Sequence, residues 1–88
     1  MRKEHPRSRG ETIFDILKVI SEERDEAKKT RIMQKACLDL GNFQKYLHFL
    51  MERGFVGNSV DPEGKSYYLT EKGRDLLKGL REVERVLR

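Results

Sequence analysis

The first third of the chain has apolar side chains at helical spacing. They are separated by three or four residues, or lie directly beside such positions, so they share one face of a helix. These residues are Ile13, Phe14, Ile16, Leu17 and Ile20. No apolar repeat continues after Arg24. We therefore predict a first helix from about Gly10 to about Arg24.

Two further helices are predicted in residues 30–53. Thr30 and Asp39 are each suited to the N-cap, because their side-chain oxygens can accept a hydrogen bond from a free backbone N–H. The inward face of the earlier helix would consist of Ile32, Met33 and Ala36, and that of the later helix of Leu40, Phe43, Leu47 and Leu50. Gly54 lies where a glycine ends a helix in the left-handed conformation.

A β-hairpin follows. One strand is predicted from Phe55, a turn at residues 61–64, and a return strand over residues 66–69. Tyr67 and Tyr68 are consecutive, so they should point to opposite faces of the sheet. Thr70 would then cap a last helix that runs to the C-terminus.

The last helix has a second apolar pattern. Its members recur at the heptad intervals of three and four, and they are Gly73, Leu76, Leu80, Val83 and Leu87. We expect the last four to form the interface of a homodimer, while Leu77 packs on its own domain. The alternative is that the whole helix folds onto its own domain. A helix over residues 71–88 would be ~27 Å long, so its end should project from so small a domain.

The order of these elements is typical of an α+β winged helix-turn-helix fold, with three helices, a two-stranded wing and a C-terminal helix. Residues 1–9 would be a basic arm, residues 10–70 the DNA-binding domain and residues 71–88 the dimerisation helix. In such folds the second helix of the motif presents its N-terminal half to the major groove of DNA.

The predicted outward face of the third helix is polar. It consists of Gly41, Asn42, Gln44, Lys45 and His48. Asparagine and glutamine can form paired hydrogen bonds with adenine, and lysine can donate to guanine. Polar residues also cover the solvent face of any amphipathic helix, so only the surrounding order of elements favours DNA contact.

Positive charge is concentrated near the predicted motif. The 88 residues have a net charge of +4, yet residues 11–26 have a net charge of −4 and residues 27–53 one of +4. We expect phosphate contacts from the start of the second helix, the hairpin tip and the N-terminal arm; these are Lys28, Lys29, Thr30, Arg31, Lys65, Arg7 and Arg9, with Arg2 and Lys3. A plain turn lysine is an equally good interpretation of Lys65.

Composition argues against several other functions. The single cysteine, Cys37, has no partner, and we expect it to be a small buried hydrophobe. No CxxC, HExxH or glycine-rich phosphate motif is present, so we expect no metal, no cofactor, no small-molecule ligand and no enzymatic activity. No apolar run is long enough to span a membrane. A cytoplasmic, nucleoid-associated protein is the expected setting.

Several short motifs resemble small archaeal winged-helix DNA-binding proteins over roughly residues 10–80. They are Lys29-Thr30-Arg31-Ile32-Met33, Ala36 with Leu38, Tyr46-Leu47, and Leu69-Thr70-Glu71-Lys72-Gly73. Some members of that family are chromatin-type proteins that dimerise through an antiparallel coiled coil of the last helix, and others are transcriptional regulators. The resemblance implies an archaeal or archaeal-virus origin and DNA contacts from Lys29, Thr30, Arg31 and the helix after Asp39.

The sequence therefore predicts a homodimeric protein that binds double-stranded DNA and regulates transcription. One alternative is a sequence-tolerant chromatin or architectural protein, which would coat any duplex. Another is a winged helix used only for protein interaction, whose third helix would have an apolar outer face.

Overall fold

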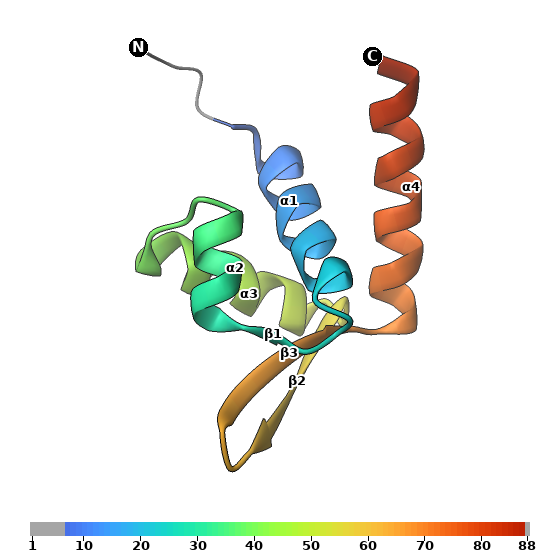
Figure 1. Ribbon diagram of the computed structural model, residues 1–88. Helices are drawn as coiled ribbons and strands as arrows, with labels where there is room; N and C mark the ends of the chain where they lie inside the picture. The colour runs from blue at the N-terminus through green and yellow to red at the C-terminus, as the bar shows by residue number, and fades with distance from the viewer. Residues whose placement is uncertain (1–6, 88) are drawn as a thin grey trace.

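The computed structural model describes residues 7–87, which form four helices and three strands (Figure 1). In chain order the elements are α1 (Arg9–Glu22), β1 (Ala27–Lys28), α2 (Lys29–Lys35), α3 (Leu40–Glu52), β2 (Val56–Asp61), β3 (Gly64–Leu69) and α4 (Glu71–Leu87). The predicted order of helices and the hairpin is confirmed.

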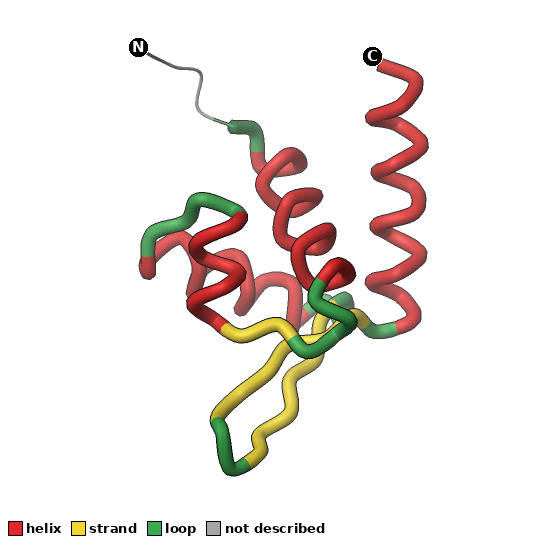
Figure 2. The backbone as a smooth tube through the Cα atoms, in the orientation of Figure 1, coloured by secondary structure: helices red, strands yellow, loops and turns green. Residues whose placement is uncertain are grey.

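The sheet has three antiparallel strands in the order β1-β3-β2. The hairpin of β2 and β3 pairs Val56 with Leu69 at its base and Asp61 with Gly64 at its tip. It projects away from the helices as a wing (Figure 2). The predicted two-stranded sheet was incomplete, because Ala27 of β1 also pairs with Tyr67. A strand of two residues is too short to show an alternating pattern.

The core lies where α1, α2 and α3 meet the base of the sheet. Its fully buried large side chains are Ile16, Leu17, Ile20, Ile32 and Leu50. The rings of Phe43 and Tyr67 meet edge to face, with centroids 5.9 Å apart, which fixes α3 against β3. Tyr67 is buried and Tyr68 is exposed, so the predicted opposition of the two tyrosines is confirmed.

Side-chain caps define three of the helix starts. Ser8 and Glu11 form a capping box at α1, the Asp39 carboxylate accepts from the backbone N–H of Asn42 at 2.8 Å, and the Thr70 hydroxyl accepts from that of Gly73 at 3.0 Å. Thr30 was wrongly predicted as a cap. The helix α2 begins at Lys29, because Lys28 is extended in strand β1 and leads directly into the helix.

Two further expectations of burial are wrong. Leu40 is the first residue of α3 and is 47% exposed, because the inward face of the helix begins only at Phe43. Cys37 is exposed in the turn between α2 and α3, where its φ of 55° ends the helix in the left-handed conformation.

The last helix, α4, lies beside α1 and runs antiparallel to it (Figure 1). Gly73, the first member of the heptad pattern, packs against its own domain. It is buried, and a Cβ atom there would lie 2.0 Å from the carbonyl oxygen of Phe55. Leu77 packs into the core as predicted, and Leu76 and Leu80 pack partly against it. Beyond them Val83, Val86 and Leu87 are exposed.

Candidate nucleic-acid interface

The starts of α2 and α3 share a groove, and the residue before α2 contacts the tip of the wing. Lys29 and Thr30 of α2 line the same groove as Leu40 of α3. Lys28, which precedes α2, lies 3.9 Å from Asp61 at the tip of β2. We call this the α2–α3–wing surface, and it consists of Lys28, Lys29, Thr30, Arg31, Leu40, Gly41, Asn42, Gln44, Lys45, His48 and Lys65.

The five polar positions predicted to face outward on α3 are all exposed; they are Gly41, Asn42, Gln44, Lys45 and His48. Burial of Phe43, Leu47 and Leu50 on the opposite side of the helix fixes this orientation. Its outward face therefore has hydrogen-bonding groups available over about two turns of helix.

Two of these side chains have acidic neighbours. The Asn42 amide donates to the Asp39 carboxylate at 3.4 Å. The His48 Nε2 lies 3.4 Å from a carboxylate oxygen of Glu52. Lys45 lies over the ring of Tyr46, 5.6 Å from its centroid. The Gln44 amide thus has the fewest neighbouring interactions of the hydrogen-bonding side chains on this face.

The cations around α2 differ in how far they are already paired. Glu23 accepts hydrogen bonds from Arg31 at 3.2 Å and from Lys35 at 3.5 Å. The hydrogen bond from Arg31, supported by Lys35, lowers the pKa of the Glu23 carboxyl below its ordinary value. Lys29 is exposed and forms no ion pair with any residue between 7 and 87. Among the cations around α2, Lys29 is therefore the one that a phosphate could bind without breaking an ion pair within residues 7–87.

Two of the three arginines assigned to the N-terminal arm, Arg7 and Arg9, are among the described residues. Arg7 forms an ion pair with Asp15 and donates to the carbonyl oxygen of Ala36 at 2.6 Å. It thereby links α1 to the turn that joins α2 and α3. Arg9 is exposed in the first turn of α1. The predicted phosphate contacts of Arg2 and Lys3 lie outside the described residues.

The wing has mixed charge. Lys65 is exposed on β3, one residue from the turn, and lies opposite Val60, which is 73% exposed. Asp61 and Glu63 are the acidic residues of the tip, and the Asp61 carboxylate accepts from the backbone N–H of Glu63. Lys65 is therefore the one basic side chain of a wing whose tip is acidic.

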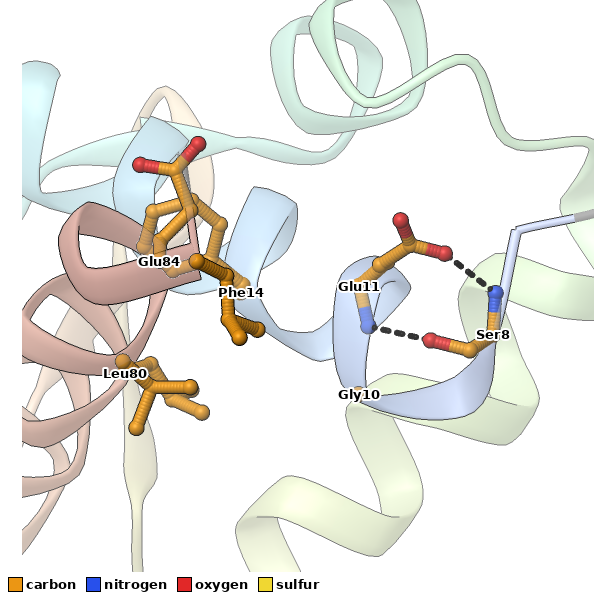
Figure 3. A pocket seen from close by; sticks show the side chains of 8 residues that line it. Ser8, Gly10, Glu11, Phe14, Leu80 and Glu84 are labelled. Atoms are coloured by element: carbon orange, nitrogen blue, oxygen red, sulfur yellow. Dashed lines mark hydrogen bonds between the residues drawn. The ribbon is translucent and has the colours of Figure 1, made fainter.

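Two open apolar grooves were not predicted from the sequence. One, of about 550 Å³, lies between α2 and the start of α3 and is lined by Lys29, Thr30, Met33, Gln34, Leu38 and Leu40. The other, of about 410 Å³, lies between the start of α1 and the end of α4, and its lining residues come from both helices (Figure 3). Glu11 and Glu84 line the second groove. The exposure of Leu40 had no separate sequence signal, because Leu40 fits the regular apolar repeat of α3. The exposure of Leu87 agrees with the predicted projection of the last helix.

Residues 7–87 contain neither a candidate metal site nor a membrane-spanning helix. No group of three or more His, Cys, Asp or Glu side chains in that part of the chain could hold a metal ion. None of the helices there is long and apolar enough to cross a bilayer.

Comparison with known proteins identifies the family. A family model described as winged helix-turn-helix matches residues 6–88. The chain belongs to the winged helix-turn-helix family. An uncharacterised protein of the archaeon Methanocaldococcus jannaschii is 39% identical to it over 85 residues, which cover 97% of this chain and 81% of that protein.

Solved structures support the same winged helix-turn-helix assignment. Sso10a-2, a DNA-binding protein from Sulfolobus solfataricus, superimposes with a TM-score of 0.80 at 29% identity, over 91% of this chain and 81% of that chain. A winged-helix DNA-binding protein from STIV gives a TM-score of 0.80 at 21% identity, over 90% of this chain and 92% of that chain. The resemblance to archaeal winged-helix proteins is thus confirmed.

Proposed function

We propose that this winged helix-turn-helix protein binds double-stranded DNA through the α2–α3–wing surface and regulates transcription as a homodimer. It would act as a binding protein rather than an enzyme, at the nucleoid. The observation that supports this most strongly is the exposure of Gln44 and Lys45 on the outward face of α3, together with that of Lys29 at the start of α2, a cation that has no ion-pair partner within residues 7–87.

Contacts to phosphates and contacts to bases would come from different helices. Lys29, Thr30 and Arg31 at the start of α2 would contact phosphates, which position a protein without sequence preference. The outward side chains of α3, above all Gln44 and Lys45, would contact base edges in the major groove. Gly41 leaves space near the start of α3, since only the Asp39 carboxylate lies within 4 Å of the position of a Cβ atom there.

The dimer would form through the end of α4. Val83, Val86 and Leu87 are 54%, 77% and 79% exposed, and Leu80 is only partly covered by its own domain. Burying one such side chain is worth roughly 1.5–3 kcal/mol relative to its exposed state. A second copy that covers the last turns of α4 would bury several of them at once. A two-fold dimer would place two α3 helices on one duplex, as in other helix-turn-helix proteins.

One observation favours the alternative of a sequence-tolerant architectural protein. Asn42 is already bonded to Asp39, and His48 lies beside Glu52, so few groups on α3 are left to distinguish bases. A protein-interaction module is less well supported, because Leu40 and Met51 are the only large apolar residues exposed on α3 within the described chain.

A salt series of duplex binding tests this proposal. If a dimer neutralises roughly six to ten phosphates, we expect the dissociation constant to rise by a factor of about 10³–10⁵ between about 50 and 200 mM salt. Lys29→Ala should reduce the salt slope by about 0.9 for each phosphate that the protein no longer neutralises, whereas Lys78→Ala, an exposed cation on α4, should not. Absence of binding at low salt, or a flat response, would refute the DNA proposal.

The same titration separates the two DNA functions. A regulator should bind a duplex selected from a random pool far more tightly than the unselected pool, by a factor on the order of 10³ or more. Equal affinity for both would favour the architectural protein.

A further inference from the structure

The groove between α2 and α3 combines apolar lining with positive charge. Met33 and Leu38 are half-buried in it, and Leu40 stands 47% exposed at its edge. Lys29 is the charged member of the lining, and no acidic residue belongs to it. The groove between α1 and α4 is also apolar, but Glu11 and Glu84 line it. Charge complementarity therefore favours a polyanion at the first groove and not at the second.

The position of Leu40 directs it away from the core. It is the first residue of α3, and Cα–Cβ bonds in a helix tilt toward the N-terminus. Its side chain therefore extends past the start of the helix, the end that enters the major groove in helix-turn-helix proteins. The Asp39 cap fixes this turn through its hydrogen bond to the backbone of Asn42.

We propose that Leu40, supported by Met33 and Leu38, forms an apolar subsite for the C5-methyl group of thymine. This inference rests on the proposed DNA-binding function and adds a specificity-determining residue to it. The thymine methyl is the apolar group that the major groove presents, and apolar side chains recognise it by contact. Lys29 would hold a neighbouring phosphate while Leu40 covers the methyl group.

Replacement of thymine by deoxyuridine isolates this contact, because it removes only the methyl group. Binding of the full chain to a fluorescent duplex and to its deoxyuridine counterpart is measured by anisotropy at one salt concentration. The wild type should bind the deoxyuridine duplex about fourfold more weakly for each methyl group buried. In Leu40→Ala the two affinities should become equal, and Leu40→Met should keep most of the difference.

Met51→Ala is the matched control. Met51 is an exposed apolar residue of the same helix, 36% exposed, but it lies at the opposite end. Its variant should discriminate thymine from deoxyuridine as the wild type does. Because each comparison is a ratio for one protein, a small loss of stability in a variant does not affect it.

The outcomes separate this inference from the proposed function. If the wild type binds both duplexes equally, the thymine subsite is refuted and DNA binding stands. Discrimination that persists in Leu40→Ala, or that is lost in Met51→Ala, also refutes the subsite. If the wild type binds neither duplex, both the subsite and the DNA-binding function are wrong.

Discussion

The carboxylate of Asp25 accepts a hydrogen bond from the backbone N–H of Leu69 at 3.0 Å, although the two residues are 44 positions apart. Its other oxygen accepts from the Arg74 guanidinium at 2.7 Å. One side chain in the turn after α1 therefore fixes both the end of β3 and the first turn of α4. Asp25 itself has a φ of 62°, a conformation that aspartate and asparagine tolerate better than most residues.

Asp25→Ala should destabilise the fold by about 1–3 kcal/mol, because the backbone N–H of Leu69 loses its acceptor in a partly buried site. Asp25→Asn keeps an acceptor oxygen and suits the positive φ, so it should cost less. Urea unfolding of the three proteins measures the difference. Equal stability of the alanine variant and the wild type would show that this link is unimportant.

The close approach of α4 to the chain before β2 predicts opposite effects at two glycines of one helix. Gly73→Ala would place a Cβ atom 2.0 Å from the Phe55 carbonyl oxygen. It should cost about 1–3 kcal/mol as α4 shifts outward. Gly79→Ala faces open space and should stabilise the helix by about 0.8–1 kcal/mol. Thermal unfolding distinguishes the two variants. Destabilisation at both positions would contradict the placement of Gly79 in open space.

The ion pairs of Glu23 predict a variant that binds DNA more tightly. Glu23→Gln removes the carboxylate that pairs with Arg31 and Lys35, so both cations become available to phosphates. Duplex affinity should rise, most of all at low salt, and the salt slope should steepen by about 0.9 for each additional phosphate that the protein neutralises. An unchanged or weaker affinity would mean that these cations do not face the duplex.

The pH dependence of stability provides a control for that variant. Arg31 lowers the pKa of Glu23 below its ordinary value of 4.5 in the folded state. The carboxylate therefore contributes stability that is present above pH 4.5 and is lost as the pH falls through the lowered pKa. Glu23→Gln should lack this part of the acid-induced loss in urea midpoints. An identical pH profile in the two proteins would count against the ion pair.

The exposed end of α4 predicts how a dimer can be dissociated. Because Val83 and Leu87 are 54% and 79% exposed, Val83→Asp with Leu87→Asp should give a folded monomer. Val60→Asp on the wing is the matched control, since Val60 is 73% exposed there and should leave the dimer intact. Sedimentation at micromolar concentration would refute the interface if the wild type were monomeric or the double variant remained dimeric.

The elements that could be predicted from the sequence are those with local signals. The spacing of Ile16 and Ile20, the Asp39 and Thr70 caps, and the left-handed Gly54 each depend on neighbours a few residues away. Strand β1 has no such signal, because its two residues are defined only by their pairing with β3. Helical periodicity predicts on which side of α3 Leu40 lies. It does not predict that Leu40 is exposed, because this depends on where the core ends along the helix.

Local spacing also predicts which residues of the candidate site are exposed, although no observation yet shows that they bind DNA. The polar face of α3 follows from periodicity alone. The hydrogen bonds and ion pairs of the surrounding arginines do not follow from periodicity. Arg7 bonds to Ala36 across 29 positions, and Arg31 pairs with Glu23 from the segment before β1. Those interactions separate the available cation Lys29 from others that the fold already uses.

DNA binding at the α2–α3–wing surface is tested most sharply by recording which backbone amide NMR signals of labelled protein shift when an unlabelled duplex is added. If DNA binds at the α2–α3–wing surface, the largest shifts should occur at Lys29, Thr30, Gln44 and Lys45, with smaller ones at Lys65 and little change at Lys78 on α4. Shifts concentrated along α1 and α4, with the α2–α3–wing surface unaffected, would contradict it.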